Sequence, residues 1–170
     1  MEKEIALFEE GLNEYTWTTV ISENLALAIW ILLGSILISQ ISLITGLAYM
    51  LFALVMILVV MRKLICTRCF YYGKRCHVGW GKISSALFKK EEIEKFSTCA
   101  GQKIAPVLFG LLAIIPVIFG IISMVSAFSV LKCVLFILMA GAILYSSIFA
   151  RKKSCEKCKM KLVCPGSAAK

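Results

Sequence analysis

Residues 25–61 decide the fold class, because they read LALAIWILLGSILISQISLITGLAYMLFALVMILVVM and contain no charged side chain. One membrane-spanning helix needs about 20 apolar residues to cross a hydrocarbon layer about 30 Å thick. The stretch therefore has room for two spans, and the polar residues Ser39, Gln40 and Ser42 mark the turn between them. The sequence predicts a helical hairpin in a membrane.

A second apolar block occupies residues 104–150, where Lys132 is the only charged residue. Its length again suits two spans, with a polar turn near residues 126–129. We therefore expect an all-α integral membrane protein with four transmembrane helices in two hairpins. The four predicted spans are residues 25–39, 43–61, 104–123 and 130–150.

The composition of the whole chain excludes several classes of protein. Of the 170 residues, 60% are hydrophobic and 17% are charged, whereas soluble domains average about 45–50% and 25%. A water-soluble enzyme and a small secreted disulfide scaffold are excluded. The lack of Asp, Glu, Arg and His at mid-depth in the spans disfavours a proton-coupled transporter or channel. Since the chain also lacks Asp and any Ser/His/Asp or His-Glu-x-x-His pattern, we expect a non-enzymatic protein.

The charged residues lie in the segments outside the apolar blocks and give the chain a net charge of +9. Residues 62–103 hold ten basic and three acidic residues, and residues 151–170 hold seven basic and one acidic. Lys and Arg beside membrane spans are retained on the cytoplasmic side, so this loop and tail are predicted to be cytoplasmic, together with the N-terminus. We expect a multi-pass protein of the cell membrane whose basic surface attracts anionic lipid headgroups and not nucleic acid.

Residues 1–24 form an acidic segment without the basic start of a secretory signal peptide. Within it, Ile5, Phe8, Leu12 and Tyr15 recur at helical spacing. This periodicity predicts an amphipathic helix that lies on the membrane surface.

The basic loop is predicted to contain a second surface helix. It is expected over residues 84–99, with Glu91 and Lys95 one helical turn apart and able to pair. Aromatic side chains with polar tips favour the headgroup region of a membrane. We therefore expect Tyr71, Tyr72 and Trp80 at that level.

Six of the eight cysteines follow the two hairpins in matched strings. Each string reads Arg-Lys-x-x-Cys-x-x-Cys, beginning at Arg62 and at Arg151, and a third cysteine follows after six or five intervening residues. We interpret a hairpin with its cysteine string as an internal repeat that occurs twice. Since two spans separate the strings, both are predicted on the same membrane face. The cysteines are Cys66, Cys69 and Cys76 in the first string, and Cys155, Cys158 and Cys164 in the second.

Paired Cys-x-x-Cys units are typical of zinc sites. A disulfide network is disfavoured on the cytoplasmic side, where thiols are kept reduced. We hypothesise one zinc site that clamps the hairpins together, or two separate sites with one string each. The shared site would use Cys66, Cys69, Cys155 and Cys158, with Cys76, Cys164 and His77 as further candidate ligands.

Two other chemistries use the same thiolates. An iron–sulfur cluster is one alternative, although only Cys164-Pro165 matches the end of the ferredoxin string. Thiol redox exchange or the handling of soft metal ions is another, because nearby cations lower the pKa of a thiol and make it reactive. The leading hypothesis is a metal-stapled module that binds an unidentified protein partner or lipid. The cations near the strings are Arg68, Lys74, Arg75, Lys157, Lys159 and Lys161.

Overall fold

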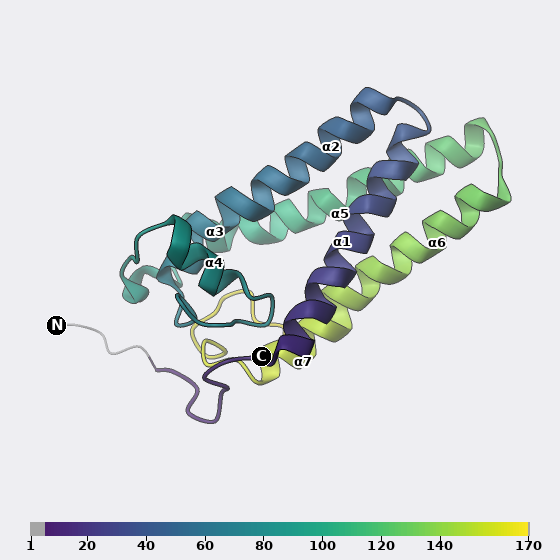
Figure 1. Cartoon of the computed structure of the whole chain (residues 1–170). Coiled ribbons are helices and arrows are strands. Elements are labelled where there is room, and N and C mark those ends of the chain that lie inside the picture. Colours follow the sequence, from purple (N-terminus) through teal and green to yellow (C-terminus); the bar gives the residue numbers. More distant parts are fainter. Residues whose placement is uncertain (1–5, 170) are drawn as a thin grey trace.

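Four long apolar helices form the body of the protein in the computed structural model, which describes residues 6–169 (Figure 1). Each is long and apolar enough to cross a membrane. The prediction of an all-helical protein with four helices that could span a membrane is therefore confirmed. Within the described residues, the only β-pairing is an isolated bridge between Leu12 and Cys158. The four helices are Trp17–Ser39, Leu43–Arg68, Ala100–Ser126 and Val130–Glu156.

The first hairpin turns at the predicted residues. Helix α1 (Trp17–Ser39) starts after Thr16, whose side chain accepts a hydrogen bond from the Thr19 N–H. Helix α2 (Leu43–Val55) starts after Ser42, which caps it in the same way. The second span then continues through a π-helical segment η1 (Met56–Val60), a short helix α3 (Met61–Leu64) and a 3₁₀ turn η2 (Cys66–Arg68).

The second hairpin repeats this order of elements. Helix α5 (Ala100–Ser126) is followed by α6 (Val130–Leu144), the π-helical segment η4 (Tyr145–Ala150) and α7 (Arg151–Glu156). Lys132 lies near the turn, and its amine donates hydrogen bonds to the carbonyls of Ser123 at 3.1 Å and Ala127 at 3.0 Å. These carbonyls belong to the end of α5, where helical acceptors lack partners within the helix. Lys132 thus provides hydrogen bonds to backbone carbonyls at the end of the third span.

Helix α1 packs against α2, α5 and α6, and small residues allow this close approach. A Cβ atom at Gly46 of α2 would lie 2.8 Å from the Ser35 carbonyl oxygen of α1. A Cβ atom at Gly34 would lie 3.0 Å from Pro116 of α5. The buried phenol of Tyr49 donates to the Leu112 carbonyl at 2.8 Å, which joins α2 to α5.

The predicted interfacial helix near the N-terminus is wrong for the part of the chain that the structure describes. Residues 6–16 form turns instead of a helix, and Ile5 lies outside the described residues. The backbone N–H groups of Phe8 and Leu12 donate to the carbonyls of Lys159 and Lys157, both at 2.9 Å. Pairing with the C-terminal tail thus uses donors that a helix would use internally.

The predicted surface helix begins earlier and ends earlier than expected. Helix α4 covers Trp80–Leu87 and follows Gly79, whose φ of 70° is a left-handed conformation that favours glycine. The chain is extended at Phe88, and a 3₁₀ turn η3 (Ile93–Lys95) follows. The ion pairs in this loop also differ from the prediction, since Glu91 pairs with Arg68, and Lys95 pairs with Glu92.

Two of the three aromatic residues expected at the headgroup level are buried within the protein. The side chains of Tyr71 and Trp80 are 2% and 8% exposed. Both find hydrogen-bond partners within the protein, because the Tyr71 hydroxyl donates to the Leu12 carbonyl and the Trp80 indole donates to Asn24 of α1. Their polar tips are thus satisfied by the protein itself.

We predict that Gly46→Ala destabilises the fold. The added Cβ must displace the backbone of α1 at Ser35, and such overpacking costs about 1–3 kcal/mol. Thermal unfolding in detergent micelles measures the effect. Gly141→Ala in α6 is the matched control, because its Cβ would meet nothing within 4 Å. Equal melting temperatures for the two variants would contradict the close packing of α1 and α2.

Candidate functional site

The structure places both cysteine strings at one end of the helix bundle. Cys66 lies in η2 at the end of the second span, and Cys155 lies in α7 at the end of the fourth. Figure 1 shows α3, α4 and α7 at the end of the bundle opposite both hairpin turns. Sequence reasoning therefore placed the two strings correctly relative to each other.

Each of the six cysteines in the strings is the first residue of the same kind of backbone turn. The carbonyl of each accepts a hydrogen bond from the backbone N–H three residues later, at N···O distances of 2.9 to 3.4 Å. The two strings thus have matching local geometry as well as matching spacing. The pairs are Cys66 with Cys69, Cys69 with Tyr72, Cys76 with Gly79, Cys155 with Cys158, Cys158 with Lys161, and Cys164 with Ser167.

Two tyrosines and the N-terminal segment join the strings to each other. The Tyr71 hydroxyl donates to the Leu12 carbonyl at 2.6 Å and accepts from the Lys159 N–H at 3.1 Å. The Tyr15 hydroxyl donates to the Ser154 carbonyl at 2.6 Å, and its ring lies 5.7 Å from that of Tyr71. Since Tyr71 follows Cys69 by two positions and Lys159 follows Cys158 directly, these bonds hold the second cysteines of both strings in one region.

The pKa values of the thiols report this proximity. Removal from water raises the pKa of Cys69 well above its ordinary value, and the thiols of Cys66, Cys76 and Cys158 raise it further. Burial likewise raises the pKa of Cys158 to about 11, with a contribution from Cys155 and from Cys164. The Cys158 thiol of the second string therefore lies close enough to Cys69 of the first string to affect its pKa.

These thiols are protonated at neutral pH, which differs from the expectation that nearby cations would activate them. Burial and the neighbouring thiols raise the pKa of Cys69 and of Cys158, because desolvation and like charge both disfavour a thiolate. Thiols with raised pKa values are poor nucleophiles. Spontaneous thiol exchange at these two positions is accordingly disfavoured.

His77 lies close to Tyr15 and near enough to Arg151 to feel its charge. Burial and the positive charge of Arg151 lower its pKa to about 4, so the imidazole is neutral at pH 7. Its ring meets the ring of Tyr15 edge-on, with centroids 6.1 Å apart. A neutral imidazole offers a nitrogen lone pair, which is the form that binds metals. His77 therefore keeps the chemistry required of a ligand.

The arginines that open the two strings fix the loops behind them. The guanidinium of Arg62 lies 5.6 Å from the centre of the Trp80 ring, and the Arg62 carbonyl accepts from the Ser84 hydroxyl. Arg151 donates to the Gly166 carbonyl at 2.6 Å, beyond the third cysteine of its string. Each arginine thus folds the chain that follows its own cysteines back toward the span.

The thiols are near one another without forming an assembled metal site. Within residues 6–169, no three Cys, His, Asp or Glu side chains are arranged to hold a metal ion. Within the first string, the thiols of Cys66 and Cys76 raise the pKa of Cys69, and within the second, those of Cys155 and Cys164 raise the pKa of Cys158. Between the strings, the Cys158 thiol raises the pKa of Cys69. Metal binding would require the thiols to move together from these positions.

Sequence reasoning missed the tyrosines that connect the strings. The aromatic ring and polar tip of Tyr71 predict a position at the membrane interface, and the helical spacing of Tyr15 predicts a position on a helix face. In the sequence, Tyr71 lies close to a cysteine and Tyr15 lies close to the first span. Neither position indicates that the phenol is buried. Comparisons with protein-family models, with curated proteins and with solved structures found no match. The chemistry of the site is therefore inferred from its own residues.

We predict that Tyr71→Phe loosens the contact between the strings. Loss of the hydroxyl leaves the Leu12 carbonyl and the Lys159 N–H without their partner, which costs about 1–3 kcal/mol for buried groups. Maleimide labelling of Cys158 should become faster. Tyr72→Phe is the control, because its hydroxyl donates to Phe88 within the first loop. If both variants label at the rate of the wild type, Tyr71 does not hold the strings together.

Proposed function

We propose that the protein is a non-enzymatic multi-pass membrane protein in which the repeat cysteines bind zinc and fasten the two hairpins together. The observation that carries this proposal is that Cys69 and Cys158, which come from different hairpins, lie close enough for the Cys158 thiol to raise the pKa of Cys69. The bonds of Tyr71 to Leu12 and Lys159 support it, because they hold these cysteines in one region. A metal there would join chain segments that are otherwise linked by hydrogen bonds.

Zinc suits these thiols better than redox exchange does. Exchange requires a thiolate at neutral pH, and the raised pKa values of Cys69 and Cys158 disfavour it. A divalent ion deprotonates a thiol that coordinates it, so a protonated resting state is no obstacle. It also offsets the repulsion between neighbouring thiolates, which is the second reason that these thiols resist ionisation. Zinc prefers four sulfur or nitrogen ligands, as this module can supply.

Two ligand arrangements follow from the contacts. A shared Cys₄ site uses Cys66, Cys69, Cys155 and Cys158, and the link between Cys69 and Cys158 favours it. Separate sites would use one string each, and the closeness of Cys76 to Cys69 favours this arrangement, with His77 as a fourth ligand for one of them. Cys164 would complete the second string. The zinc content per chain distinguishes the two.

We also infer that the two hairpins arose by internal duplication. The π-helical segments η1 and η4 each begin ten residues before the first cysteine of their string. The segment ahead of each hairpin pairs with the string of the other. The backbone N–H of Leu12 donates to the Lys157 carbonyl at 2.9 Å, and the backbone N–H of Glu91 donates to the Thr67 carbonyl at 3.0 Å. Such reciprocal pairing is what a pseudo-twofold arrangement of two repeats would produce.

The cysteine module is proposed to face the cytoplasm of a cell membrane, with both termini. Within residues 6–169, Lys132 is the one Lys or Arg near the hairpin turns, and the others lie toward the cysteine end. Cytoplasmic retention of basic loops supports this orientation. The module would then present a positively charged surface, held by the metal, to a protein partner or to anionic lipid.

Metal analysis of the anaerobically purified protein tests the proposal. We expect about one zinc per chain for a shared Cys₄ site or two for separate sites, without a visible absorption band. Cys69→Ser and Cys158→Ser should each lower the zinc content. Cys133→Ser, in the fourth span near the hairpin turn, should leave it unchanged.

Two outcomes would replace zinc with another chemistry. Iron with acid-labile sulfide would identify an iron–sulfur protein. Metal-free chains that readily form a disulfide between Cys69 and Cys158 would identify a thiol-exchange protein.

A further inference from the structure

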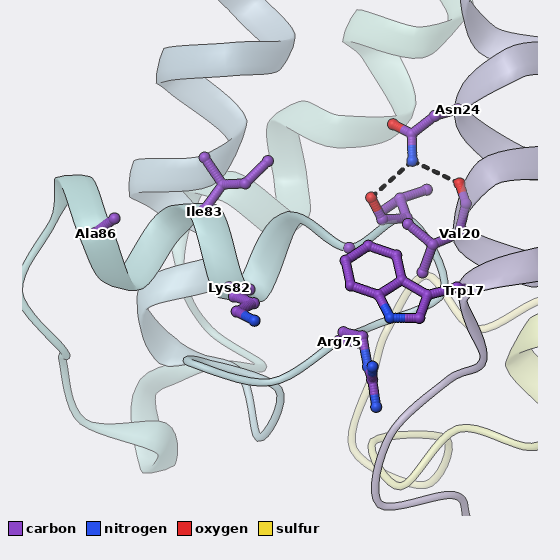
Figure 2. A pocket seen from close by; sticks show the side chains of 9 residues that line it. Trp17, Val20, Asn24, Arg75, Lys82, Ile83 and Ala86 are labelled. Carbon is purple, nitrogen blue, oxygen red and sulfur yellow. Dashed lines mark hydrogen bonds between the residues drawn. The ribbon is translucent and has the colours of Figure 1, made fainter.

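A groove of about 540 Å³ lies between the first turns of α1 and helix α4 (Figure 2). Trp17 and Val20 of α1 form one side, and Ile83 and Ala86 of α4 form the other. The indole of Trp17 is 55% exposed and Ile83 is 45% exposed. The groove is therefore an open apolar channel beside the first span, and none of the candidate metal ligands lines it.

Hydrogen bonds and a close backbone approach fix the inner end of the groove. The Asn24 amide donates to the Val20 carbonyl at 2.7 Å and to the Val78 carbonyl at 2.9 Å, as Figure 2 shows. Its oxygen accepts from the Trp80 indole at 3.3 Å. A Cβ atom at Gly79 would lie 2.7 Å from a methyl group of Val20. The loop is thus held against α1, and the Asn24 amide is already occupied by protein partners.

Positive charge is confined to one side of the groove. Arg75 and Lys82 direct their charged ends to the same side in Figure 2, whereas Ile83 points to the opposite side. The Arg75 guanidinium lies 5.4 Å from the centre of the Trp17 ring and also pairs with Glu14 at 2.6 Å. No carboxylate of residues 6–169 forms an ion pair with the exposed Lys82. Lys82 is therefore available to an external anion.

We propose that this groove binds one anionic phospholipid from the leaflet beside the cysteine module. Its phosphate lies at Lys82 and Arg75, and an acyl chain runs between Trp17 and Ile83. The amphipathic axis of the groove matches that of a lipid, and its position at the end of a span matches the depth of the headgroups. This gives the proposed lipid interaction a defined site, and it does not require the metal.

Fluorescence quenching by lipids with brominated acyl chains tests the site. The full-length protein is placed in phosphatidylcholine nanodiscs that contain a small fraction of brominated phosphatidylglycerol or of brominated phosphatidylcholine. Trp17 is the main reporter, because Trp30 and Trp80 are 2% and 8% exposed, and Trp17→Phe gives the background. We expect stronger quenching by phosphatidylglycerol at the same mole fraction.

Lys82→Gln should require about five times more brominated phosphatidylglycerol for the same quenching, as expected for the loss of one cation near an anionic headgroup. Lys152→Gln changes the net charge equally and lies outside the groove, so it should behave as the wild type. Equal quenching by the two lipids, or equal effects of the two variants, would overturn the proposal. Zinc content measured on the same samples separates this outcome from a failure of the metal site, because Lys82→Gln leaves every candidate ligand intact.

Discussion

The hydrogen bonds between the N-terminal segment, Tyr71 and the C-terminal tail are the interaction on which the cysteine module depends. The helices of the two hairpins pack through apolar surfaces, which gain no hydrophobic energy by contacting each other instead of lipid. Packing in the membrane therefore does not determine where the loops meet. Backbone hydrogen bonds from Phe8 and Leu12 to the C-terminal tail determine where the loops meet, since they align the tail beside the first string. Tyr71 completes this arrangement with one bond to each side.

This arrangement explains the chemistry of the thiols. Folding the tail, the loop and the N-terminal segment together partly buries Cys69 and Cys158 and places them near other thiols. Each effect disfavours a bare thiolate, so the module holds several protonated thiols at neutral pH. A divalent metal would offset both the desolvation of a thiolate and the repulsion between thiolates, because its positive charge stabilises the thiolates that bind it. The same folding buries Trp80 against Arg62 and sets α4 beside α1, where the apolar groove forms.

The sequence predicted the helices well and the contacts between the loops poorly. A charge-free run such as residues 25–61 must form helices in lipid, because no other local structure satisfies its backbone there. The spacing of the cysteines likewise required both strings to emerge at one end. In contrast, the pairing of Leu12 with the tail joins residues far apart in the chain, and the helical spacing of Phe8 and Leu12 suggested a different structure. Whether metal occupies the thiols depends on side-chain positions that spacing does not determine.

Cross-linking between Cys69 and Cys158 tests most directly the claim that the two hairpins meet in one thiol site. The other six cysteines are replaced by serine, and the chain in membranes is treated with a short thiol-specific cross-linker before its peptides are identified by mass spectrometry. A chain that retains Cys69 and Cys133 is the control, because Cys133 lies in the fourth span near the hairpin turn. The account predicts an efficient intramolecular cross-link for Cys69 with Cys158 and none for the control. Absence of the first cross-link would contradict a shared site.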